Sequence, residues 1–108
     1  MLYTILLVDH NSLLRQGLRS LLDSQGDFDV IAEARDGQEA LYRAIANPPD
    51  LVLMDAQLPG MDGLQTAAQI KRRLPDVRLI LLTETKTSDF LPEPLQVGAD
   101  AYVLKDAS

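Results

Sequence analysis

The residues of this sequence that could carry chemistry stand where runs of apolar residues end. Asp55 directly follows the run LVLM and precedes a turn that contains Pro59, Gly60 and Gly63. An apolar run of this length, closed by turn residues, is typical of a strand buried on both faces of a sheet. A carboxylate at the end of such a strand can serve a functional site, although aspartate also commonly starts a turn for purely structural reasons.

Three further apolar runs end in polar or charged residues. The first run ends at Asp9 and His10, and two later runs end at Thr83 and at Lys105. Because ligands bind beyond the carboxyl ends of the strands in open α/β sheets, these side chains should converge at one edge. Two carboxylates, a hydroxyl and an ammonium at one edge are hard to explain as turn chemistry, so we predict a functional site there.

Strands and helices should alternate along the chain to position these residues. The apolar runs predict strands at 4–8, 30–32, 51–54, 77–82 and 101–104. Apolar residues recur at helical spacing between the first four runs, at Leu14, Leu18, Leu21 and Leu22, at Leu41, Ala44 and Ile45, and at Leu64, Ala67, Ile70 and Leu74. Ser12 can cap the first helix, and Asp36 with Glu39 forms a capping-box pattern before the second. This alternation predicts an α/β domain with a parallel sheet and right-handed crossovers.

Length and composition limit the classes of protein to consider. The 108 residues suffice for one domain, with 46% hydrophobic and 24% charged residues, as in ordinary globular proteins. The absence of cysteine excludes disulfides and cysteine-ligated metals, and no run is long enough for a membrane helix. With no signal-peptide pattern either, we expect a cytoplasmic protein. The net charge of −6 should repel nucleic acid and anionic membranes, so contact with DNA would need another domain or partner.

Two stretches carry a resemblance to a known family. LVLMDAQLPGMDG, residues 51–63, and ILLVDHNSLLRQGLRSLL, residues 5–22, resemble the receiver domain of two-component response regulators. The branch that the chain most resembles usually carries a helix-turn-helix DNA-binding domain after the receiver. The resemblance implies a flavodoxin-like, doubly wound sheet of five parallel strands in the order 2-1-3-4-5. It also implies that residues 1–108 are the N-terminal part of a longer transcriptional regulator.

The resemblance also assigns roles to the residues at the strand ends. It implies that Asp55 accepts a phosphoryl group from a sensor histidine kinase or a small phosphodonor, and that Mg²⁺ offsets the charge. Such a domain assists its own phosphorylation and is not a turnover enzyme. The remaining roles are metal binding by Asp9, Asp55 and the backbone carbonyl of Gln57, and phosphoryl contact or switching by Thr83, Lys105 and Tyr102.

The sequence departs from the family at two positions of this site. His10 stands where the family has a second acid that contacts the metal, and Glu84 stands where the residue after the hydroxyl is usually small. Imidazole suits Zn, Cu, Fe and Ni better than Mg²⁺, although His10 could also simply face solvent. Glu84 could supply a carboxylate to the metal, or it could pair with Lys105 and block the phosphoryl position. We therefore expect weaker Mg²⁺ binding than in a His10→Asp variant.

Two further departures concern the last helices of the family fold. Pro92 and Pro94 disfavour helical backbone at the residues before them, so we expect a disrupted fourth helix with at most about one turn between Ser88 and Gly98. The sequence ends at Asp106-Ala107-Ser108, before the fifth helix that the family has. Without that helix, apolar surface of the first and fifth strands would be open, and we expect self-association.

One alternative to a phosphorylated receiver remains open, and the sequence argues against two others. His10 and Glu84 favour a pseudo-receiver, a protein-interaction module that works without phosphorylation. An aspartyl phosphatase would need a second aspartate two residues after its nucleophile, where this chain has Gln57. A flavin-binding protein of the same fold would need a phosphate-binding loop after the first strand, and none is present.

Overall fold

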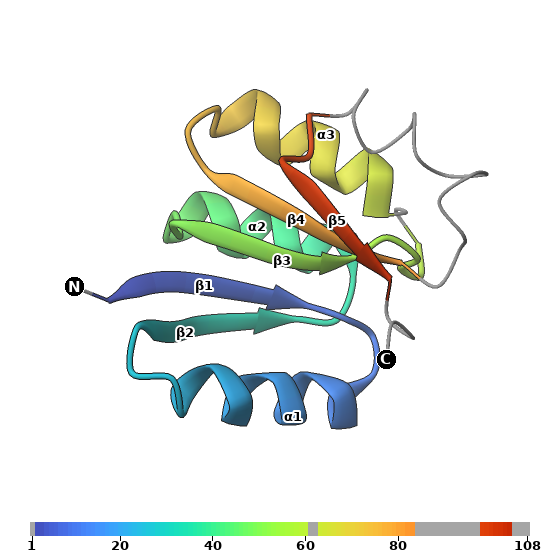
Figure 1. Cartoon of the computed structure of the whole chain (residues 1–108). Helices are drawn as coiled ribbons and strands as arrows, with labels where there is room; N and C mark the ends of the chain where they lie inside the picture. Colours follow the sequence, from blue (N-terminus) through green and yellow to red (C-terminus); the bar gives the residue numbers. More distant parts are fainter. Residues whose placement is uncertain (1, 61–62, 84–97, 105–108) are drawn as a thin grey trace.

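A computed structural model describes residues 2–60, 63–83 and 98–104, and within them it contains a parallel sheet with helices on both faces (Figure 1). The strands are β1 (Tyr3–Val8), β2 (Phe28–Ala34), β3 (Leu51–Asp55), β4 (Arg78–Thr83) and β5 (Ala101–Leu104), and the helices are α1 (Ser12–Asp23), α2 (Gly37–Ala46) and α3 (Gly63–Arg73). All pairings are parallel and the strand order is β2-β1-β3-β4-β5. The predicted strand order is therefore confirmed.

Helix α1 covers one face of the sheet, and helices α2 and α3 cover the other (Figure 1). Side chains alternate along β1 between these faces. Ile5 and Leu7 pack with Leu18 and Leu22 of α1, whereas Leu6 and Val8 belong to the larger core under α2 and α3. That larger core also holds the fully buried side chains of Val52, Met54, Ala67, Ile70, Leu79 and Leu81.

The two faces are not equally covered. Val52 and Met54 of β3 are fully buried under α2 and α3, while Leu51 and Leu53 on the α1 face are only partly buried. Helix α1 itself has no fully buried residue. Among the described residues, apolar side chains of β3 on the α1 face therefore keep contact with solvent.

The ends of several elements differ from the sequence expectations, most clearly those of α1 and β2. Asn11, not Ser12, is the N-cap of α1, and its side-chain oxygen accepts the N–H groups of Leu13 and Leu14 at 3.0 and 3.2 Å. Strand β2 is longer than the predicted 30–32 at both ends, because it pairs with β1 along its whole length, from Tyr3 to Val8. Local propensity does not predict these ends, because the Asn11 side chain sets the start of α1 and the pairing with β1 sets the length of β2.

The capping of α2 follows the prediction in part. Asp36 is the N-cap and accepts the N–H of Glu39 at 2.8 Å. The Glu39 carboxylate, however, accepts the N–H of Arg35 at 2.9 Å rather than that of the cap residue. Both acids thus satisfy backbone donors near the start of α2, as a capping box does.

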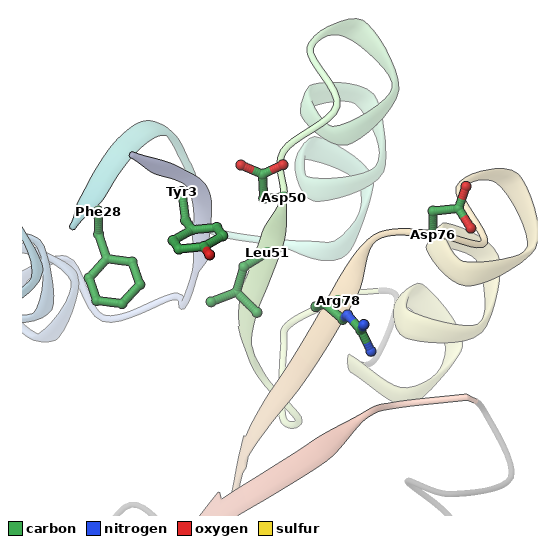
Figure 2. A pocket seen from close by; sticks show the side chains of 6 residues that line it. All are labelled: Tyr3, Phe28, Asp50, Leu51, Asp76 and Arg78. Atoms are coloured by element: carbon green, nitrogen blue, oxygen red, sulfur yellow. The ribbon is translucent and has the colours of Figure 1, made fainter. Parts of the chain in front are cut away.

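A cavity of about 390 Å³ lies at the amino ends of the strands, opposite the predicted site (Figure 2). The first residues of four neighbouring strands contribute to it, and its lining is Tyr3, Phe28, Asp50, Leu51, Asp76 and Arg78. Because the candidate residues follow the carboxyl ends of the strands, this cavity takes no part in their chemistry.

Several expectations fall outside the part of the chain that the structure describes. They concern Glu84, Lys105, the segment with Pro92 and Pro94, and the end of the chain. None of the helices among the described residues has the length and apolar character needed to span a membrane.

Candidate functional site

Asp55 is the last residue of β3 and is buried at the carboxyl edge of the sheet. Its Oδ1 accepts the N–H of Gln57 at 2.9 Å, an Asx-type turn that fixes the carboxylate plane. The chain then continues alongside β4, where the N–H of Ala56 donates to the carbonyl of Leu82 at 2.8 Å. These two contacts hold the acid at the point where β3 ends.

Asp9 directly follows β1 and is buried beside this edge in the same way. Its Oδ1 accepts the N–H of Asn11 at 2.9 Å, and its own N–H donates to the carbonyl of Ala34 in β2 at 3.0 Å. Both buried aspartates are therefore oriented by a backbone N–H two residues further along the chain. The neighbouring strands β1 and β3 bring them together, as the sequence predicts.

His10 approaches both aspartates with one ring nitrogen. Its Nδ1 lies 3.4 Å from Oδ2 of Asp55 and 3.7 Å from Oδ1 of Asp9, while 57% of its side chain remains exposed. One ligand atom from each of the three residues lies within 4.8 Å of the others. The sequence left open whether His10 faces solvent, and in the structure it reaches the site while part of its ring stays accessible.

The other predicted site residues lie on the last two strands. Thr83 ends β4 and is fully buried, and it is paired in register with Leu104 of β5. Tyr102 of β5 is partly buried against the core under α2 and α3. Asp55 and Thr83 thus come to the same edge, whereas Lys105 and Glu84 lie outside the described residues.

Arg15 supports the site, and the sequence reasoning did not single it out. Its guanidinium donates to the backbone carbonyl of Asp9, and its Nε donates to Oε1 of Glu33 at 3.0 Å. Arg19 donates to the other oxygen of Glu33 at 2.6 Å. A signal was present in the sequence, because an arginine near the start of a helix opposes the helix dipole and needs a partner of its own.

Glu33 is the acid that balances this pair of arginines. Burial would raise the pKa of Glu33, but the hydrogen bonds and charges of Arg19 and Arg15 outweigh burial and hold the pKa below its ordinary value. Glu33 is thus stabilised as an anion. The ion pairs connect α1 and β2 to the backbone of Asp9.

Gly63 is a second residue whose importance was not predicted, because the sequence suggested only a turn. A Cβ at this position would lie 2.4 Å from the carbonyl oxygen of Asp55 and 2.5 Å from that of Ala56. The N–H of Gly63 donates to the carbonyl of Ala56 at 3.1 Å. Glycine is therefore needed where the start of α3 approaches the end of β3.

Comparison with known proteins places these residues in a family. The model of the response regulator receiver domain matches residues 5–108. The transcriptional regulatory protein LnrK of Bacillus subtilis is 42% identical over 104 residues, which cover 96% of this chain and 47% of LnrK. The chain thus spans about half the length of the curated relatives it matches.

Solved structures give the same result. A LuxR-family response regulator from Aurantimonas sp. SI85-9A1 superposes with a TM-score of 0.94 at 31% identity, covering 100% of this chain and 77% of that one. The receiver domain of the putative response regulator NarL from Mycobacterium tuberculosis superposes with a TM-score of 0.92 at 33% identity, covering 99% and 86%. The chain belongs to the family of response regulator receiver domains.

Receiver domains bind Mg²⁺ at an acidic pocket, and the residues here fit that ion only in part. Asp9 and Asp55 offer carboxylate oxygens, which Mg²⁺ prefers. The third ligand atom beside them is the imidazole nitrogen of His10, and imidazole suits later transition metals better. The set of ligands therefore departs from one that is optimal for Mg²⁺.

Proposed function

We propose that this domain accepts a phosphoryl group on Asp55 from a sensor histidine kinase or a small phosphodonor, and thereby controls a transcriptional output. The observation that carries the proposal is the placement of Asp55. It is buried at the carboxyl end of β3, with Oδ1 held by Gln57 and Oδ2 directed toward His10 at the accessible side. An oriented carboxylate of this kind can attack phosphorus.

The reaction would form an acyl phosphate. Oδ2 of Asp55 attacks the phosphorus atom while the bond from phosphorus to the donor breaks, and with acetyl phosphate the leaving group is acetate. The N–H of Gln57 keeps the carboxylate from rotating away, since it binds the other oxygen. Positioning of this kind carries most of the catalysis of phosphoryl transfer.

The new charge would act on the residues at the ends of β4 and β5. The acyl phosphate would carry a charge of about −1.5 to −2 in place of the single negative charge of the Asp55 carboxylate, next to the buried Asp9. We expect the hydroxyl of Thr83 and the ammonium of Lys105 to contact the phosphoryl oxygens, and Tyr102 to move as Thr83 does. A change in the packing of this edge would then reach the surface around β5.

The output would lie in a different domain. LnrK is a transcriptional regulatory protein, and the chain spans about half of its length. The net charge of −6 disfavours direct contact of this domain with DNA. We therefore expect DNA binding through an attached domain and a cytoplasmic location, with the receiver phosphorylated once rather than turning over a substrate.

Intact-mass spectrometry tests this proposal. The wild-type chain and Asp55→Ala are incubated with acetyl phosphate and a divalent metal, and each mass is followed with time. We expect the wild type to gain the mass of one phosphoryl group and the variant to gain none. Equal labelling of both proteins, or labelling of neither with Mg²⁺, Mn²⁺ or Zn²⁺, would contradict the proposal.

A pseudo-receiver is the second candidate, and one contact favours it. The imidazole of His10 lies 3.4 Å from the oxygen of Asp55 that would attack, so it can obstruct a phosphodonor. In that case Asp55 stays unmodified and the surface around β5 binds a partner without phosphorylation. Labelling of a His10→Asp variant by acetyl phosphate, with no labelling of the wild type, would show that the wild type is a pseudo-receiver.

A further inference from the structure

We infer that Asp9, His10 and Asp55 form a site for a divalent transition metal ion of the Zn²⁺ and Ni²⁺ class, and that His10 turns the site away from Mg²⁺. The inference rests on the proposed function, because it assigns the cofactor of the same edge. It does not depend on phosphoryl transfer itself, so metal binding and phosphorylation can be measured separately.

The chemistry of the ligand atoms is the first argument. One imidazole nitrogen and two carboxylates offer the mixed nitrogen and oxygen set that binds Zn²⁺ in many proteins. Mg²⁺ instead takes oxygen ligands and gives up its water reluctantly. Replacing an acid by His10 removes one negative charge and one oxygen ligand, and both changes weaken the site for Mg²⁺ more than for Zn²⁺.

The spacing of the ligand atoms is the second argument. With metal–ligand bonds of about 2.0–2.1 Å, adjacent ligands lie about 3.4 Å apart around a tetrahedral ion and about 2.9 Å apart around an octahedral one. The Nδ1 atom of His10 lies 3.4 Å from Oδ2 of Asp55 and 3.7 Å from Oδ1 of Asp9. These separations are closer to the edge of a tetrahedron than to that of an octahedron.

The surroundings hold two of the three ligands in place. Asn11 and Gln57 donate backbone N–H groups to the Asp9 and Asp55 carboxylates, and Arg15 holds the carbonyl of Asp9. Contacts of this kind orient metal ligands and raise affinity. The imidazole is largely accessible, with 57% of the side chain exposed, so an ion can enter from solvent and keep water in its remaining position.

Calorimetric titration of the untagged 108-residue protein with ZnCl₂, NiCl₂ and MgCl₂ tests the inference. Wild type, His10→Ala, His10→Asp and Asp55→Asn are compared. Asp29→Asn serves as the matched control, because Asp29 is an exposed acid on β2 away from the site. His10→Ala should fold normally, since most of the imidazole is exposed.

We expect one Zn²⁺ per chain, with affinity reduced about tenfold or more by His10→Ala and by Asp55→Asn, and unchanged by Asp29→Asn. His10→Asp should bind Mg²⁺ more tightly and lose its preference for Zn²⁺. Because His10 is the only histidine and cysteine is absent, the imidazole resonances in NMR spectra report on this residue alone. They should shift on addition of Zn²⁺ in wild type and in Asp29→Asn.

Unchanged Zn²⁺ affinity in His10→Ala, or imidazole resonances that do not move with Zn²⁺, would overturn the inference. The two proposals fail separately. Loss of Zn²⁺ binding in His10→Ala without any labelling of Asp55 would keep the metal site and reject phosphorylation. Labelling of Asp55 together with unchanged Zn²⁺ affinity in His10→Ala would support phosphorylation and reject the metal site.

Discussion

At the scale of single residues, the site depends on a few atoms held by backbone N–H groups. The carboxylates of Asp9 and Asp55 each accept the backbone N–H of the residue two positions later, and this contact orients them at the edge of the sheet. His10 reaches the two acids through Nδ1, while 57% of its side chain is exposed. The two aspartates therefore define the position of the site, and His10 affects which ligand the site binds.

Gly63 gives a prediction at this scale. Gly63→Ala should lower the free energy of unfolding by about 1–3 kcal/mol, because the added Cβ would meet the carbonyl oxygens of Asp55 and Ala56 at 2.4 and 2.5 Å. The backbone would have to shift to make room for this Cβ, and the same backbone carries Asp55. Gly63→Ala should therefore also slow phosphorylation. Urea denaturation and the labelling rate with acetyl phosphate measure the two effects.

Gly17 provides the matched control for this substitution. A Cβ at Gly17 in α1 has nothing within 4 Å, so Gly17→Ala should stabilise the protein by about 0.5–1 kcal/mol through helix propensity. Equal effects of the two substitutions would show that the close approach at Gly63 does not constrain the fold.

At the scale of elements, the start of α1 is set by Asn11. Asn11→Ala should cost about 1 kcal/mol, because the side chain caps the N–H groups of Leu13 and Leu14. Ser12→Ala should change stability by less than about 0.5 kcal/mol, as expected of an exposed helical residue. Thermal or urea unfolding of both variants measures the two effects. A larger loss of stability in Ser12→Ala than in Asn11→Ala would show that Ser12 is the N-cap, as the sequence predicts.

The link between α1 and β2 predicts a dependence on pH. The pKa of Glu33 is lowered in the folded protein, so its ion pairs add stability above its ordinary pKa, and this contribution is lost as pH falls through the lowered value. At pH 7, Glu33→Gln should cost about 1 kcal/mol, since the pair with Arg15 is partly exposed. The difference between the two proteins should shrink in acid.

Urea unfolding of wild type and Glu33→Gln between neutral pH and about pH 3.5 measures this difference. Asp29→Asn on the same strand is the control and should change stability by less than about 0.5 kcal/mol. A constant difference between wild type and Glu33→Gln at all pH values would mean that the charge of Glu33 does not contribute.

The sequence predicted the elements better than their ends or their connections. Alternating apolar runs and helical stripes predict a parallel α/β sheet, and the resemblance to receiver domains implies its strand order, which is observed. The convergence of Asp9, Asp55 and Thr83 follows because the carboxyl ends of parallel strands meet at one edge. The contact of Arg15 with the Asp9 carbonyl could not be derived in this way, because it depends on how α1 lies against β1 and β2. The clash that makes Gly63 necessary likewise depends on the exact approach of α3 to β3.

In the molecule as a whole, the described residues cover the two faces of the sheet unevenly, and this favours self-association. The expectation that the first strand is open is wrong, because Ile5 and Leu7 of β1 are buried under α1. Leu51 and Leu53 of β3 are only partly buried on this face, and Val103 of β5 is 47% exposed. Exposed apolar residues that lie together promote contact between copies. We therefore expect the apparent mass in light scattering to rise with concentration.

Val103→Lys should reduce this association, because a charge on the surface of β5 opposes burial between copies. Arg72→Lys, a conservative change at an exposed residue of α3, is the control and should leave association unchanged. A wild-type monomer at the highest attainable concentration would count against an open apolar face.

Chemical mapping of the modified residue is a direct test of whether Asp55 accepts a phosphoryl group. After incubation with acetyl phosphate, borohydride reduces an acyl phosphate to an alcohol, so a phosphorylated aspartate becomes homoserine. Peptide mass spectrometry then locates the change. We expect homoserine at position 55 alone, with none in untreated protein or at the nearby Asp9. Homoserine at another aspartate, or at none while a known receiver domain in the same experiment is modified, would contradict it.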